Sequence, residues 1–123
     1  MTRSVTLYGI PNCDTVKKAR AWLAGQGVEA RFHDFKKEGV PPDRLDAWLR
    51  AAGWETLLNR KGTTWRRLDA ASQLAAQDEA GARALMLREA SVIKRPVAEW
   101  GVGAGAITVG FDAEAWAARV SRA

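Results

Sequence analysis

Cysteine and histidine are nearly missing from this sequence. The 123-residue chain has one cysteine, Cys13, and one histidine, His33. A single cysteine excludes an internal disulfide and a metal site built from cysteines alone. With only one histidine, a four-ligand zinc site would need mostly carboxylates, which is not the usual chemistry of zinc. We therefore predict no bound metal and no tightly bound cofactor, and any second sulfur in a redox reaction has to come from another molecule.

Long apolar runs are also missing. No stretch has the roughly 20 consecutive apolar residues that a membrane-spanning helix needs. The first residues, MTRSVTLYGIPNC, lack the apolar core and cleavage site of a secretory signal. We therefore expect a soluble, cytoplasmic protein with no membrane partner. Its 47% hydrophobic and 27% charged residues are typical of one folded domain and not of a disordered chain.

Positive charge is in excess but is not concentrated. The formal net charge is +5, yet the longest basic runs are pairs, and no basic arm interleaved with aromatic residues occurs. Solvated surface is therefore the first interpretation of the charge, a small anionic ligand the second, and nucleic acid a distant third. The expected protein is a monomer.

Two strand-like segments flank a helical one at the start of the sequence. RSVTLYG at 3–9 is rich in β-branched and aromatic residues, and VEARFHDF at 28–35 alternates apolar and polar positions. Between them, apolar residues at helical spacing follow Asp14, and Gly25 and Gly27 supply the stop. A strand–helix–strand unit of this length predicts parallel pairing with a right-handed crossover.

The middle of the chain, residues 36–90, carries no strand signal. Pro42 suits a helix start and Gly53 its end. After a predicted loop at 60–67, the alanine- and leucine-rich segment 68–89 is predicted to be helical with a break near its middle. This part of the chain is therefore predicted to be a helical block.

Strand-like sequence returns after Pro96. VAEW and AITVGF, on either side of a glycine-rich GVGAG turn, predict a hairpin, and Asp112 suits the cap of a last helix. The complete order of elements predicts an α/β protein with a mixed four-stranded sheet and helices packed on it.

Cys13 stands between the turn-like segment GIPN and the first predicted helix. A free thiol titrates near 8.5, so only about 3% of it is the reactive thiolate at pH 7. A helix N-terminus offers unpaired N–H groups and a positive dipole end, and Lys17 lies one turn further along. These groups favour the thiolate, so we interpret Cys13 as a nucleophile. The alternative, a small apolar residue, fits its polar surroundings less well.

The neighbours of Cys13 are candidates for binding a substrate. Asn12 is also a candidate helix cap, and the hydroxyl or N–H of Thr15 is a candidate contact to an oxyanion. The carboxylate of Asp14 interacts favourably with the helix dipole but disfavours the thiolate beside it, and the sequence does not decide which effect is larger. Lys17 is the candidate cation.

Two other features have a plain structural interpretation. His33 is on a predicted strand, where a lone histidine is more often structural than a base or a ligand. Arg95 precedes Pro96, which restricts Arg95 to extended conformations. A cis bond would hold Arg95 at a turn, but an edge strand preceded by a solvated arginine is the simpler interpretation of these two residues alone.

Several motifs occur together and in order along nearly the whole chain: YGIPNCDTVKKARAWL, RFHDF, GWETLLN, GTTWRRLD, IKRPV and GF. In this combination the sequence resembles the thioredoxin-fold arsenate reductase (ArsC) family, which also contains the Spx regulators, and it is most similar to the small YffB-type members. The resemblance implies a single domain with a thioredoxin-like fold. Its core would span about 1–36 and 91–123, and an inserted helical subdomain about 37–90.

The resemblance also implies roles for individual residues. The nucleophilic cysteine of the family maps onto Cys13. Its arginine next to a cis-proline, which faces the thiol and binds the oxyanion, maps onto Arg95 and Pro96. A second cation of the family falls on Arg60 or Lys61.

Departures from the family pattern bear on the function. The third arginine of true arsenate reductases would fall at Ala106 or Ile107, and the second cysteine of a Cys-x-x-Cys motif is replaced by Val16. We therefore predict a thiol reductase that acts on an oxidised thiol or an oxyanion and uses glutathione as co-substrate, or glutaredoxin. The alternatives are an Spx-like regulator that binds RNA polymerase or another protein, and a genuine arsenate reductase.

Overall fold

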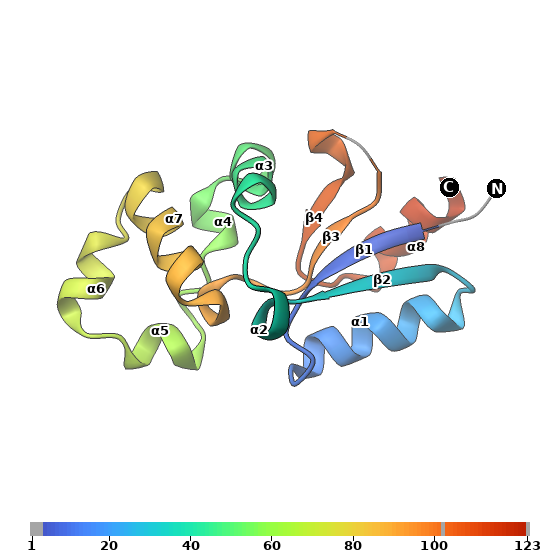
Figure 1. Cartoon of the computed structure of the whole chain (residues 1–123). Coiled ribbons are helices and arrows are strands. Elements are labelled where there is room, and N and C mark those ends of the chain that lie inside the picture. The colour runs from blue at the N-terminus through green and yellow to red at the C-terminus, as the bar shows by residue number, and fades with distance from the viewer. Residues whose placement is uncertain (1–3, 102, 123) are drawn as a thin grey trace.

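The structure of the protein is a computed structural model that describes residues 4–101 and 103–122 (Figure 1). In this part of the chain a four-stranded sheet has the order β2-β1-β3-β4, with β1 at Ser4–Gly9, β2 at Glu29–Asp34, β3 at Val97–Glu99 and β4 at Ile107–Val109. β1 pairs in parallel with β2 and antiparallel with β3, which pairs antiparallel with β4. The predicted mixed sheet and hairpin are confirmed.

Helix α1 (Asp14–Gly25) joins β1 to β2, and α8 (Ala113–Arg122) follows β4. The chain between β2 and β3 contains α2 (Phe35–Glu38), α3 (Pro42–Ala52), α4 (Trp54–Leu57), α5 (Thr63–Arg67), α6 (Ala70–Ala75), α7 (Glu79–Arg88) and the 3₁₀ turn η1 (Ala90–Val92). A second 3₁₀ turn, η2 (Ala104–Ala106), lies in the β3–β4 connection. In Figure 1, helices α4 to α7 gather on the left, away from α1 and α8. The division into a core and an insertion at residues 37 and 90 stays a prediction.

Local signals in the sequence set several of these boundaries. Pro42 is the first residue of α3, and Gly53 ends that helix with a φ of 85°, a conformation that only glycine adopts without cost. Asp112 precedes α8, and its Oδ1 accepts hydrogen bonds from the N–H groups of Glu114 at 3.1 Å and Ala115 at 3.3 Å. The predicted starts of these two helices are confirmed.

The sheet is packed on both faces, because successive side chains of β1 point to opposite sides. Val5 and Leu7 pack in one hydrophobic cluster with α1 and α8, where Trp116 is buried. Tyr8 packs in the other cluster with the helical block, where Trp48 is fully buried. Burying a large apolar side chain contributes about 1.5–3 kcal/mol, so both clusters hold the helices to the sheet.

Two local predictions are wrong. The segment 60–67, predicted to be a loop, contains α5, since a helix of little more than one turn is too short to show a periodic pattern. Phe35, predicted to end the second strand, begins α2 instead. There Asp34 is the N-cap, and its Oδ1 accepts a hydrogen bond from the N–H of Lys36 at 2.8 Å.

Glu99 of β3 fastens α3 to the sheet. Its carboxylate accepts hydrogen bonds from the Tyr8 hydroxyl at 2.9 Å, from Nε of Arg44 at 2.8 Å and from Nε1 of Trp48 at 2.8 Å. Nη2 of Arg44 lies 2.6 Å from the same carboxylate, whose side chain is only 13% exposed. Burial and the neighbouring Glu99 raise the pKa of Tyr8 to about 12. One carboxylate therefore joins β1, β3 and α3.

Candidate active site

Cys13 is the N-cap residue of α1, with extended backbone angles of φ −135° and ψ 123°. Its carbonyl accepts the first helical hydrogen bond, from the N–H of Lys17 at 2.9 Å. The suggestion that Asn12 caps this helix is therefore wrong, because the chain enters the helix one residue later. The half-buried sulfur of Cys13 makes no capping hydrogen bond of regular geometry. It lies where the unpaired N–H groups of the first helical turn are nearest.

The surroundings of Cys13 lower the pKa of its thiol. Partial burial is the largest single influence and raises the pKa, because it disfavours the charged form. The N–H of Val16, the guanidinium of Arg95 through hydrogen bonding and charge, and the N–H of Thr15 act in the opposite direction and together outweigh burial. The predicted helix-terminus effect is thus present, and the cation that acts on the sulfur is Arg95. Lys17, the cation that the sequence suggested for this role, is an exposed residue of α1.

Arg95 reaches the thiol from the turn that precedes β3. The Arg95–Pro96 peptide bond is cis, as the resemblance implied, and Pro96 is buried. Nη1 of Arg95 donates a hydrogen bond to the carbonyl oxygen of Ser91 at 2.8 Å, which orients the guanidinium. Its buried Nε has no acceptor within the described part of the chain. An unpaired buried N–H costs about 1–3 kcal/mol, so holding Arg95 in this place is energetically costly for the fold.

A cavity of about 250 Å³ surrounds the thiol and is lined by Cys13, Thr15, Asn59, Lys94, Arg95 and Gly110. Three of these, Asn59, Lys94 and Gly110, were not candidates from the sequence. Asn59 and Lys94 stand directly beside the candidates Arg60 and Arg95, and Gly110 belongs to the motif GF. The motifs thus pointed to the right segments but to neighbouring side chains.

An isolated β-bridge between Leu58 and Ile93 brings Asn59 and Lys94 together. The N–H of Asn59 donates to the Val92 carbonyl at 2.7 Å, and the N–H of Lys94 donates to the Leu57 carbonyl at 2.8 Å. Leu58 and Ile93 are buried. The helical block therefore supplies one wall of the thiol cavity through this bridge.

Arg60 and Lys61 line a neighbouring cavity of about 390 Å³, together with Glu55, Thr56, Leu58, Asn59 and Lys94. The guanidinium of Arg60 lies over the ring of Trp54, with 5.8 Å from Cζ to the ring centroid. Neither cation is in the lining of the thiol cavity itself. Their role in binding a substrate, like that of the exposed residues Asn12 and Asp14, stays a prediction.

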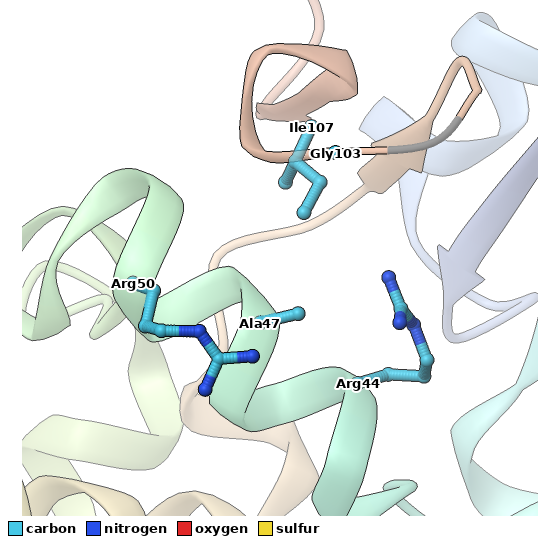
Figure 2. Close-up of a pocket in the computed structure, with 5 residues that line it drawn as sticks. All are labelled: Arg44, Ala47, Arg50, Gly103 and Ile107. Carbon is cyan, nitrogen blue, oxygen red and sulfur yellow. The ribbon is translucent and has the colours of Figure 1, made fainter.

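The positions considered for a third cation do not line the thiol cavity. Ile107 instead lines a separate cavity of about 220 Å³ between α3 and the β3–β4 connection (Figure 2). Figure 2 shows Arg44, Ala47, Arg50 and Gly103 around the same space. Arg44 is already paired with Glu99 there, so this cavity is no substitute for the missing cation beside Cys13.

His33 has a structural contact. Its Nε2 lies 2.8 Å from the carbonyl oxygen of Gly39, and a carbonyl only accepts, so Nε2 carries the proton and donates. This hydrogen bond ties β2 to the end of α2. Within residues 4–101 and 103–122, no three His, Cys, Asp or Glu side chains gather as metal ligands would.

The structure is thus a thioredoxin-like sheet with a cysteine at the start of its first helix and an arginine beside that thiol. The chain belongs to the ArsC family, whose sequence model matches residues 8–119. The family predicted from the motifs is confirmed.

Known relatives include solved structures and a regulator. The chain is 49% identical to the YffB protein, with a TM-score of 0.87 over 94% of this chain and 98% of that one. It is 47% identical to an arsenate reductase (ArsC) related protein from Brucella melitensis, with a TM-score of 0.74 over 96% and 95% of the two chains. It is also 27% identical, over 76% of this chain and 69% of the other, to the global transcriptional regulator Spx of Streptococcus pyogenes.

The helices are short compared with the thickness of a bilayer. Among the residues that the structure describes, none of them is long and apolar enough to cross a membrane.

Proposed function

We propose that this protein is a thiol-dependent reductase that uses Cys13 as its nucleophile and an external thiol, glutathione or the thiol of glutaredoxin, to complete the cycle. The observation that carries the proposal is the lowered pKa of an accessible thiol, held beside Arg95 in a cavity. A lowered pKa raises the thiolate fraction near neutral pH, and the thiolate is the reactive form. The proposed location is the cytoplasm, where thiols are kept reduced.

The cycle has two exchange steps. The Cys13 thiolate attacks one sulfur of a disulfide, the S–S bond breaks, and the other sulfur leaves as a thiolate that takes a proton from water. The mixed disulfide on Cys13 is then attacked by the external thiolate, which forms a new disulfide with the bound group and releases the Cys13 thiolate. No second cysteine exists in the chain to resolve the intermediate.

Each group around the thiol has a part in this scheme. The N–H groups of Thr15 and Val16 stabilise negative charge on the sulfur of Cys13 before attack and after release. Arg95 does the same with its guanidinium, through hydrogen bonding and charge. Arg95 and Lys94 are the cations in the lining of the thiol cavity. They are fewer than the three arginines of true arsenate reductases, so we favour a disulfide over arsenate as the substrate.

The test measures the rate of alkylation of Cys13 against pH in the wild type and in Arg95→Gln. The midpoint of the wild-type profile is expected below 8.5 and should move up in the variant, because the variant loses the cation that favours the thiolate. Mass spectrometry after incubation with oxidised glutathione should show one adduct, absent from Cys13→Ser. A wild-type midpoint at or above 8.5, or no adduct, would refute the proposal.

A second candidate is a regulator that binds RNA polymerase or another protein, and the likeness to Spx favours it. A regulator of this kind does not need turnover at Cys13. If Cys13→Ser retains full activity in cells and the protein is recovered in a stable complex, the regulator is supported and the reductase is not.

A further inference from the structure

The thiol cavity and the cavity beside it share two residues, Asn59 and Lys94. The thiol cavity alone, at about 250 Å³, is smaller than the roughly 300–1,000 Å³ typical of sites for small organic ligands. The neighbouring cavity adds about 390 Å³. A ligand that occupies both cavities would fill a volume within that typical range, and its reacting atom would lie at the end in the thiol cavity.

The neighbouring cavity is basic. Arg60, Lys61 and Lys94 line it, and Glu55 is the acidic residue among its lining. In the described part of the chain the ion pairs join other residues, and none of these three cations takes part in one. Arg60 is steadied by the ring of Trp54 instead of by a carboxylate. The positive charge of this cavity is therefore open to a ligand.

Lys94 connects the two cavities. A Cβ placed on Gly110 would lie 3.2 Å from Cε and 3.8 Å from Nζ of Lys94, so the lysine chain lies against the bare backbone of Gly110. Gly110, with a φ of 86°, leaves room at the edge of the thiol cavity that the lysine occupies. Lys94 therefore lines both the cavity of the thiol and the cavity of the other two cations.

We propose that the cavity lined by Arg60, Lys61 and Lys94 binds the carboxylate end of the substrate or reducing thiol whose sulfur reacts at Cys13. The proposal rests on the proposed function and adds a selectivity to it: the protein prefers disulfides that carry carboxylates near the sulfur over those that carry ammonium groups. Glu55 opposes the binding of an anion there, but three cations outnumber it. The result is a site in two parts, with sulfur chemistry in one and charge recognition in the other.

The experiment compares two disulfide probes on the full-length protein. Oxidised glutathione carries more carboxylates than ammonium groups, and cystamine carries ammonium groups only. The second-order rate constant for modification of Cys13 is measured with each, and the ratio of the two constants reports selectivity free of the intrinsic reactivity of the thiol. A wild-type ratio that favours oxidised glutathione is expected, and a ratio that favours cystamine overturns the proposal.

Variants test whether the cations of the second cavity are responsible for this ratio. Arg60→Gln and Lys61→Gln should each lower it roughly two- to fivefold, and the double variant roughly tenfold, as expected for exposed charge pairs. Arg67→Gln removes an exposed arginine of α5 that lines neither cavity, and it should leave the ratio unchanged. Lys94→Gln should lower the ratio as well. Equal ratios in the double variant and the wild type would overturn the proposal.

A binding measurement separates this proposal from the reductase activity. S-methylglutathione cannot exchange with a thiol, so its binding to the Cys13→Ser protein tests the second cavity alone. NMR titration should shift the amide signals of residues 59–61, and the double variant should lose these shifts. If Cys13 is inert toward both disulfides but the shifts occur, the reductase fails and the anion site stands. If Cys13 reacts but no shifts occur, the anion site fails.

Discussion

The hydrogen bonds of Glu99 allow a quantitative prediction about how the helical block is held to the sheet. Glu99→Ala removes the acceptor of three donors. Two of the donor residues are buried, since Tyr8 is 7% exposed and Trp48 is 0% exposed. Each buried donor left unpaired costs about 1–3 kcal/mol. The side chain of Arg44 is 43% exposed, so water can solvate it, and losing its ion pair with Glu99 adds less than about 1 kcal/mol.

The expected destabilisation of Glu99→Ala is therefore about 2–7 kcal/mol, out of the 5–15 kcal/mol or so that is usual for a domain. Glu99→Gln retains an acceptor oxygen and should lose roughly half as much. Urea unfolding followed by circular dichroism measures both, with Glu29→Gln on the exposed start of β2 as the control. If Glu99→Ala lies within about 1 kcal/mol of the wild type, the network does not hold the layers together.

An optical readout checks the same contact without unfolding. Tyr8 is the only tyrosine in the chain, so an absorbance titration at alkaline pH reports its phenol alone. Glu99 raises the pKa of Tyr8, after the larger effect of burial. Glu99→Gln should therefore lower the midpoint from about 12. An unchanged midpoint would mean that the carboxylate and the phenol do not interact in solution.

Three further predictions concern pH and backbone space. The folded state raises the pKa of Tyr8, so the stability that this group contributes is complete below its unfolded pKa of about 10 and is lost as the pH rises toward about 12. Unfolding measured between these pH values should show a loss of stability in the wild type that Tyr8→Phe lacks. The folded state lowers the pKa of Cys13, so the stability that the thiolate contributes is present above the unfolded pKa of about 8.5 and is lost as the pH falls through the folded pKa. The stability of Cys13→Ser, measured beside the wild type, should lack this dependence on pH. A Cβ on Gly81 would lie 1.7 Å from the Ala75 carbonyl oxygen, so Gly81→Ala should destabilise by more than about 2 kcal/mol, whereas Gly25→Ala, with nothing within 4 Å, should change thermal stability by less than about 1 kcal/mol.

The sequence predicted most of the elements, because their signals are local. Glycine and proline mark the ends of α3, Asp112 caps α8, and the apolar period separates α1 from its flanking strands. The position of Cys13 at a helix start could be predicted for the same reason, since the turn before it and the helix after it are adjacent in the chain. The pairing of β1 with β2 followed from the short strand–helix–strand connection.

Contacts between distant segments could not be predicted in the same way. Glu99 meets Trp48 and Tyr8 across separations of 51 and 91 residues, and nothing in the local pattern around Glu99 indicates these partners. Asn59 and Lys94 meet because of a β-bridge of one residue pair, which is too short to leave an alternating pattern. Sequence motifs located these segments, but the choice of side chain at the cavity depends on how the bridge aligns them.

The same bridge suggests that the charge around the thiol depends on the packing of the helical block. Leu57 is fully buried, and its carbonyl accepts the N–H of Lys94, the residue before Arg95. Leu57→Ala should cost about 2–5 kcal/mol and loosen this alignment. The pKa of Cys13 should then move up toward its ordinary value, so alkylation at neutral pH should slow. Leu23→Ala, an equally buried leucine at the far end of α1 in the other hydrophobic cluster, provides the matched control. If both variants, still folded under the assay conditions, slow alkylation to the same extent, general loosening of the fold and not the bridge controls the thiol.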